Sequence, residues 1–156
     1  FFSSFKYAQE ASETLAAQAP DIPQRSQQPG MTPEQRREFL SEFQQPNGSV
    51  AFAVLGGVFS EGIDLPGDQL IGAFVATLGL PPFDAWHEIL KTRLQQRFGN
   101  GYEYTYLIPG LQKVAQAAGR VIRTPEDQGV IWLIDDRFLK PSVNRLLPGW
   151  WFPEPF

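Results

Sequence analysis

The sequence contains no cysteine and a single histidine, His87. Without cysteine the chain has no disulfide bond, no thiolate metal site and no cysteine nucleophile, and one histidine is too few for the usual zinc ligand sets. We therefore expect no metal site within this chain. A serine hydrolase is also disfavoured, because Ser60 lacks a glycine two residues before it and His87 is the only base available to it.

The chain also lacks long hydrophobic runs and a surplus of basic residues. No stretch of about 18 apolar residues and no charged-then-apolar leader is present, so we expect a cytoplasmic protein without membrane contact. The formal net charge of -4 argues against a generally basic nucleic-acid surface, so any phosphate contact has to come from a local cluster. The chain begins at Phe1 rather than at methionine, and we expect it to be a piece of a longer protein.

Strand-like and helix-like patterns alternate along the 156 residues, a length suited to one domain around a single core. Short apolar runs predict strands buried on both faces, and Phe1 and Phe2 are interpreted as the end of another strand. These runs occupy residues 49–55, 69–78 and 130–134. Helical spacing is found in residues 5–19, 33–45, 86–98 and 107–123. The alternation predicts an α/β fold with a mostly parallel sheet flanked by helices.

The predicted helix over residues 107–123 has two different faces. Apolar side chains share one side, namely Leu107, Leu111, Val114, Ala115, Ala118, Val121 and Ile122. Amides, guanidiniums and a glycine share the other, namely Gln112, Gln116, Gly119, Arg120 and Arg123. Guanidinium groups match phosphate oxygens, and glycine lets a ligand approach the backbone, so this face suits an anion. The alternative is an ordinary solvated face whose arginines pair with acids.

Two loops carry further candidate residues. Residues 56–66 follow a predicted strand and contain three glycines, a serine and two carboxylates, at the kind of strand end where α/β proteins bind ligands. This loop is not a phosphate-binding loop of the Walker type, because Ile63 and Asp64 occupy the positions that require lysine and serine or threonine. Ser3 and Ser4 precede a predicted helix, where they either contact a phosphate or simply cap the helix.

Four segments in a fixed order resemble helicase motifs. They are FFSSF at residues 1–5, GGVFSEGIDLPGD at residues 56–68, QAAGRVIR at residues 116–123 and GVIWLIDDRF at residues 129–138. Together they resemble motifs IV, V and VI of the second RecA-like motor domain in superfamily-two DNA helicases of the DinG and XPD type. The resemblance implies a three-layer RecA-like domain over residues 1–138, followed by an aromatic and proline-rich tail at residues 139–156.

The resemblance also implies roles for individual residues. The catalytic residues that it implies at the γ-phosphate of ATP are Gln116, Arg120 and Arg123, with Arg123 as an arginine finger. The implied nucleotide-binding residues are Glu61, Gly62, Asp64 and Gly119. The implied DNA-binding residues are Ser3, Ser4 and Ser60.

Other parts of such a helicase do not occur in this sequence. It has no Gly-Lys-Thr loop, no Asp-Glu-Ala-His box and no cysteines for an iron-sulfur cluster. The resemblance therefore implies that ATP and Mg²⁺ are shared with a first motor domain, that any iron-sulfur cluster belongs to the full-length protein, and that the fragment alone is inactive. Single-stranded DNA and that first motor domain are the expected partners. The tail either docks a replication or repair protein or packs its aromatic side chains back on the domain. The alternative is a non-catalytic interaction module built on the helicase fold.

Overall fold

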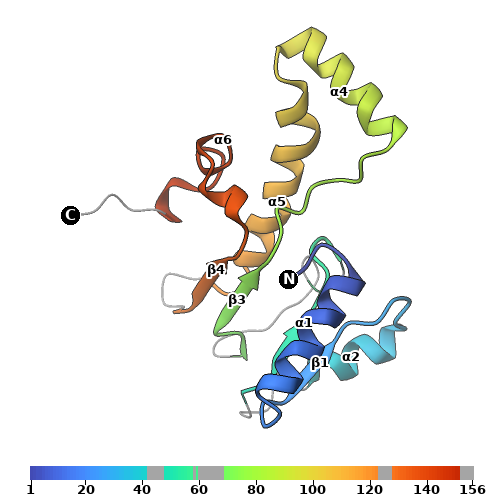
Figure 1. Cartoon of the computed structure of the whole chain (residues 1–156), viewed down its shortest axis with the longest axis vertical. Helices are drawn as coiled ribbons and strands as arrows, with labels where there is room; N and C mark the ends of the chain where they lie inside the picture. Colours follow the sequence, from blue (N-terminus) through green and yellow to red (C-terminus); the bar gives the residue numbers. More distant parts are fainter. Residues whose placement is uncertain (42–47, 58, 60–68, 123–127, 152–156) are drawn as a thin grey trace, which may run out of the picture.

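The computed structural model describes residues 1–41, 48–57, 59, 69–122 and 128–151. The α-helices in these ranges are α1 (Phe5–Gln18), α2 (Pro33–Ser41), α4 (Ala85–Phe98), α5 (Ile108–Ala118) and α6 (Pro141–Asn144). The strands are β1 (Gln24–Ser26), β2 (Val50–Phe52), β3 (Gly72–Val75) and β4 (Val130–Leu133). Shorter helices are the π-helix η3 (Glu103–Leu107) and the 3-10 helices η4 (Asp136–Leu139) and η5 (Gly149–Trp151). Figure 1 shows their arrangement.

The strands form two parallel pairs, and Phe1 and Phe2 lie between the pairs and connect them into one sheet. β1 pairs with β2 and β3 pairs with β4, both in parallel. Phe2 forms a parallel bridge with Val54 beyond the end of β2. On the other side, the Phe1 amine donates a hydrogen bond to the Phe74 carbonyl oxygen, and the Ala76 N–H donates to the Phe1 carbonyl oxygen at 2.9 Å. The order across the sheet is therefore β1, β2, Phe1–Phe2, β3 and β4, which confirms the predicted parallel sheet.

Helices lie on both faces of this sheet. Phe1 points to one face, where its ring packs against two hydrophobic clusters, one containing Leu111 of α5 and the other containing Phe39 of α2. Phe2 points to the opposite face, because neighbouring strand residues alternate. Its ring stacks on Phe52 at 5.7 Å and meets Tyr7 of α1 edge-on at 5.0 Å. The sheet thus separates α2 and α5 from α1, as expected for a three-layer α/β domain.

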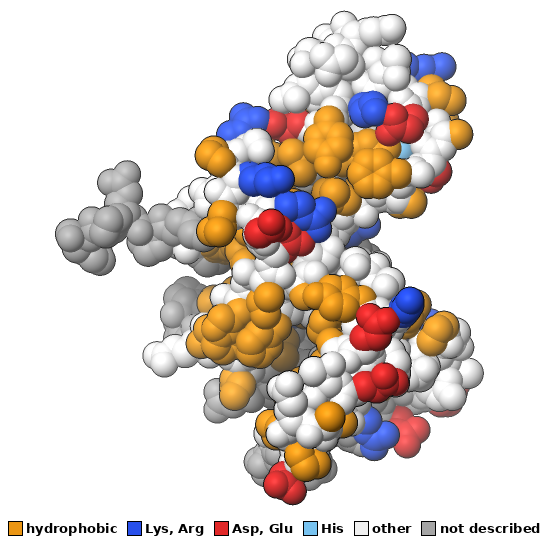
Figure 2. Space-filling view, in the orientation of Figure 1, with side chains coloured by type: hydrophobic (Ala, Val, Ile, Leu, Met, Phe, Trp, Pro, Cys, Tyr) orange, Lys and Arg blue, Asp and Glu red, His pale blue; other side chains and the backbone are white. Residues whose placement is uncertain are grey.

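The prediction that β3 and β4 are buried on both faces is wrong. Val75 is fully buried on the α5 side, but the Phe74 and Trp132 side chains are 49% and 44% exposed on the other. Their rings stack at 4.3 Å with an interplanar angle of 6°. Figure 2 shows apolar side chains gathered at the surface over β3 and β4. The reason is that α1 contacts β1 and β2, so it covers only that half of its face.

Local sequence signals set the helix ends largely as expected. The Ser4 side chain caps α1 by accepting a hydrogen bond from the Tyr7 N–H at 3.2 Å. Thr32 immediately precedes Pro33 and forms a reciprocal capping box with Gln35 in the first turn of α2. α4 begins one residue earlier than predicted, because Asp84 caps it through the His87 N–H at 2.9 Å.

The described part of the predicted tail belongs to the main core. Val143 of α6 and Leu147 are buried in the same cluster as Leu111 and Phe138, and Trp151 packs against that cluster. Residues 139–151 are therefore anchored to the domain, which weighs against an exposed docking segment over this part of the tail. No helix within the described ranges is long and apolar enough to cross a membrane.

Candidate functional site

Helix α5 carries the predicted polar face on the outside of the molecule. Leu111, Val114 and Ala118 are buried in the core, with Val114 fully inaccessible. Gln112 and Gln116 are exposed on the other side of the helix. The two-faced character predicted from helical spacing is therefore confirmed for the described residues.

The details of the buried stripe differ from the prediction. Ala117 is fully buried, although the periodicity did not place it in the core, whereas Ala115 and Ile122 are only partly buried. The helix also ends at Ala118 rather than continuing to residue 123, and Gly119 forms its carboxyl-terminal cap. Glycine is a poor helix former, so an end at this position is physically reasonable.

Gly119 is exposed at the end of α5. Its φ of -65° lies in the right-handed helical region that any residue adopts. A β-carbon added there meets only the carbonyl oxygens of Ala115 and Gln116 in the same turn, at 3.3 and 3.6 Å. As far as the described residues show, the space beyond its backbone is therefore open to a group from outside the chain.

Arg120 follows in a tightened last turn, where its N–H donates to the Ala117 carbonyl oxygen at 3.1 Å. Its side chain is half-buried and engaged in an interaction within the chain. Nearby, a β-carbon added to Gly129 lies only 2.2 Å from Val121 Cγ1 and 3.2 Å from the Ile71 carbonyl oxygen. Because Ile71 and Gly129 immediately precede β3 and β4, the end of α5 lies at the amino edge of the sheet.

The loop after β2 starts at the opposite edge of the sheet, where the middle of α5 lies beside Gly56. Gly56 adopts a left-handed φ of 76°, and the position of a β-carbon on it is 2.9 Å from Lys113 Cδ. The conformation and the Lys113 side chain together favour glycine at this position. The motif residues of this loop, Ser60, Glu61, Gly62 and Asp64, lie outside the described residues, as does Arg123.

Gln27 supports the start of this loop, and no sequence pattern predicted this role. The residue lies in the predicted polar loop between α1 and α2, yet only 8% of it is exposed. Its Oε1 accepts a hydrogen bond from the Val54 N–H at 2.9 Å. The amide side chain therefore satisfies a backbone donor of the segment that leads into Gly56 and Gly57.

Replacing Gln27 with methionine is expected to lower the free energy of unfolding by about 1–3 kcal/mol, because the Val54 N–H loses its acceptor while side-chain volume is kept. Urea denaturation of the purified chain measures the change. The matched control is Gln28→Met at the exposed neighbouring position, which should leave the unfolding midpoint nearly unchanged. Equal effects of the two substitutions would show that the Gln27 hydrogen bond contributes nothing.

Ser3 and Ser4 lie at the same edge of the sheet as Gly56 and Gly57. The parallel bridge between Phe2 and Val54 places the two segments side by side, and both run on from there toward the carboxyl edge. Both serines are exposed, and Ser4 Oγ is used as the cap of α1. The capping role that the sequence left open for this pair is thus confirmed for Ser4.

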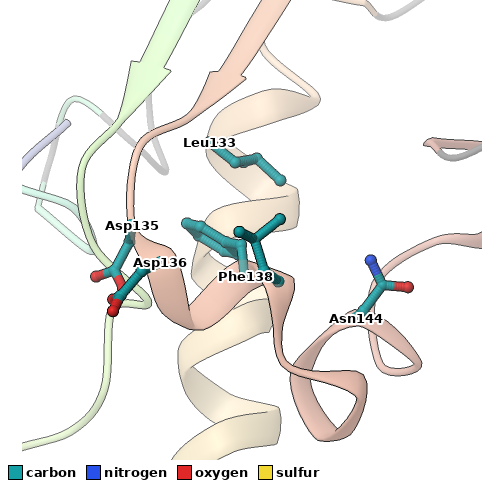
Figure 3. Close-up of a pocket in the computed structure, with 6 residues that line it drawn as sticks. Leu133, Asp135, Asp136, Phe138 and Asn144 are labelled. Carbon is teal, nitrogen blue, oxygen red and sulfur yellow. The ribbon is translucent and has the colours of Figure 1, made fainter.

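A pocket of about 360 Å³ lies beyond the carboxyl end of β4 (Figure 3). It is lined by Leu133, Asp135, Asp136, Phe138, Leu139 and Asn144. Arg137 Nε and Nη2 bind the two carboxylate oxygens of Asp135 at 2.9 and 2.6 Å. These bonds hold the pKa of the Asp135 carboxyl below its usual range. Asp135 also caps η4, so its role in this pocket is structural.

Comparison with known proteins identifies the kind of domain to which this geometry belongs. Residues 1–154 match the family described as helicase C-terminal domain. The chain belongs to this family and is of the DinG/XPD type. It is 38% identical over 106 residues to the ATP-dependent DNA helicase chl-1 of Caenorhabditis elegans, which covers 66% of this chain and 12% of the relative.

Other relatives of this helicase C-terminal domain are also long proteins. The general transcription and DNA repair factor IIH helicase subunit XPD of Arabidopsis thaliana is 33% identical over 108 residues, which is 66% of this chain and 14% of that protein. The regulator of telomere elongation helicase 1 homolog of Drosophila melanogaster is 32% identical over 120 residues, 72% of this chain and 12% of that protein. The chain thus spans 12 to 14% of the length of these relatives.

Solved structures of XPD share the fold of this helicase C-terminal domain. An apo XPD structure superposes with a TM-score of 0.71 at 23% identity, covering 93% of this chain and 29% of that one. A second XPD helicase structure gives a TM-score of 0.63 at 24% identity, covering 88% and 25%. The RecA-like α/β fold expected from the sequence is therefore confirmed.

The described motif residues of the helicase C-terminal domain fall in two places. Ser3 and Ser4 lie at the carboxyl edge of the sheet, whereas Gly119 and Arg120 lie at the end of α5 near the amino edge. Gln116 is exposed one turn before that end. Within the part of the chain that the structure describes, no three histidine, aspartate or glutamate side chains gather in the way a metal ion requires.

Proposed function

We propose that this chain is the second motor half of an ATP-dependent DNA helicase. In this role it completes an ATP site whose nucleotide-binding loop is carried by a first motor domain elsewhere in the polypeptide. Single-stranded DNA is the proposed track along which the two halves move. The relative chl-1 is named as an ATP-dependent DNA helicase and the relative XPD as a helicase subunit of a DNA repair factor, and the proposal extends helicase activity to the full-length form of this protein.

The observation that carries the proposal is the outward polar face of α5. Gln116 and Gly119 are exposed along a helix whose other side is buried against β3, so they face away from the sheet and toward any domain docked there. The open space above the Gly119 backbone supports the approach of a ligand from that side. The half-buried position of Arg120 supports a guanidinium held in a fixed orientation.

The chemistry of phosphoryl transfer explains why such residues are needed. ATP supplies the transferred γ-phosphoryl group, and Mg²⁺ neutralises part of its charge. We assign Gln116, Arg120 and Arg123 to the γ-phosphate, with Arg123 stabilising the charge that develops in the transition state. Further contacts with the nucleotide are assigned to Glu61, Gly62, Asp64 and Gly119.

Two of the residues proposed to contact DNA, Ser3 and Ser4, lie at the edge of the sheet opposite the end of α5. Ser3 and Ser4 are exposed there, and Ser60 belongs to the loop that follows β2. Hydroxyl groups beside a helix amino terminus are suitable donors for a phosphate backbone. Closure of the two motor domains on ATP, and their opening after hydrolysis, would shift these DNA contacts relative to those of the first domain.

An iron-sulfur cluster has no ligands in this chain, because the sequence contains no cysteine. If the full-length protein carries one, as the family resemblance suggests, its thiolates come from another domain. The residues proposed here for ATP and DNA do not depend on it.

The purified chain alone is expected to hydrolyse ATP no faster than buffer, with or without single-stranded DNA, because it supplies charge stabilisation without a cradle for the nucleotide. A phosphate-release assay measures this. The Arg123→Ala variant of the same chain is the control, since any turnover that survives it comes from a contaminant. DNA-stimulated turnover that is lost in the variant would contradict the proposal that the nucleotide-binding loop lies elsewhere.

A further inference from the structure

On the sheet face that carries α1, the described part of the chain leaves the side chains of β3 and β4 about half exposed. Four apolar side chains lie exposed there, and we call them the open face: Phe74, Val130, Trp132 and Ile134. Each is between 44% and 52% exposed. The strand register places Phe74 directly beside Trp132, and the alternation along residues 130–134 puts the other two on the same side.

This surface is unusual for a parallel sheet. Parallel sheets occur almost only with both faces covered by helices, because the crossover connections between parallel strands place helices on the faces. On the α5 side this rule is met, since Ala73 and Val75 are 4% and 0% exposed. On the opposite side it is met only where α1 contacts β1 and β2. The helical layer that contains α1 therefore stops halfway across the sheet, as Figure 1 and Figure 2 together show.

We infer that the open face is the docking site for an amphipathic helix from the same polypeptide, lying beside α1 in one layer. The chain spans only 12 to 14% of the length of its relatives, so most of a helicase of that size lies outside it. A helix is the occupant that continues the existing layer, and α1 already shows how one lies on this face. The apolar stripe of the docking helix needs large side chains to cover the flat Phe74–Trp132 stack.

Hydroxyl-radical footprinting of the full-length protein tests this inference. Oxidation of Trp132, measured by mass spectrometry, is expected to be slower by at least about ten-fold in the folded protein than in the unfolded protein, because a covered side chain excludes water. Less protection than that would overturn the inference. Protection that disappears on dilution would also overturn it, because the occupant would then be a second copy of the protein.

A pair of variants ties the protection to the open face. Phe74→Lys in the full-length protein is expected to restore Trp132 oxidation, because a lysine directly beside it disfavours an apolar helix. Ile89→Lys, at a position 50% exposed on α4, should leave the protection intact. A photo-reactive residue in place of Phe74 then identifies the occupant. Cross-links to a helix of the same polypeptide support the inference, and cross-links only to another molecule overturn it.

Discussion

Replacing Arg123 with alanine in the full-length helicase is expected to lower the rate of ATP hydrolysis by roughly three to five orders of magnitude, the usual contribution of an arginine finger. The loss arises because the guanidinium stabilises negative charge that develops on the γ-phosphoryl oxygens as the bond breaks. Single-stranded DNA affinity should stay within about two-fold, since Ser3 and Ser4, the described residues proposed for DNA, lie at the edge of the sheet opposite the end of α5. Steady-state ATPase rates and DNA-binding titrations give the two quantities.

The matched control for this prediction is Arg93→Ala. Arg93 lies exposed on α4, so its removal changes the total charge equally without touching α5. ATP hydrolysis by this variant should be close to that of the unmodified protein. A similar loss in both variants, or a parallel loss of DNA affinity in Arg123→Ala, would remove the reason to assign Arg123 to the nucleotide.

Replacing Gly110 with alanine is expected to lower the free energy of unfolding of the chain by about 3 kcal/mol, at the upper end of typical overpacking effects. A β-carbon at this position would lie 2.6 Å from the Leu78 carbonyl oxygen and 3.2 Å from the Gly79 carbonyl carbon. These obstacles are backbone atoms, so α5 itself has to move away from the segment after β3. The better helix propensity of alanine raises the free energy of unfolding by only about 1 kcal/mol and does not offset this loss.

The same change at the other glycine near this helix provides the comparison. Gly119→Ala meets only carbonyl oxygens of its own turn, so the unfolding free energy should change by less than about 1 kcal/mol. In the full-length helicase, however, the new methyl group narrows the approach to the backbone, and ATP hydrolysis should fall. Equal loss of stability in the two variants would contradict the described placement of α5 against β3.

The sequence predicted the parts of the fold that depend on short-range patterns. Helical spacing separated Leu111 and Val114 from Gln112 and Gln116, because the apolar residues on the buried side of a helix recur with the helical period. Ser4 and Thr32 marked helix starts through side-chain chemistry that acts within three residues. The order of the helicase-like segments predicted the RecA-like fold, which the comparison with XPD structures confirmed.

The features that escaped prediction depend on long-range packing. Gln27 is buried because it directly follows β1 and continues the pairing of that strand with β2, and nothing in a run of polar residues indicates which glutamine accepts the Val54 N–H. The apolar runs that contain Phe74 and Trp132 indicate strands but not whether a helix covers each face. The end of α5 at Ala118 reflects a tightened turn at Gly119 and Arg120 that the helical period does not encode.

The most direct test of the two-half motor is a distance measurement across the proposed cleft in the full-length helicase. A spin label on α5 at Gln112→Cys occupies an exposed position in a segment without native cysteine, and a second label is placed on the first motor domain. Pulsed electron paramagnetic resonance should show the two labels moving closer when a non-hydrolysable ATP analogue binds. A distance distribution that is the same with and without the nucleotide would contradict the proposal that α5 closes onto it.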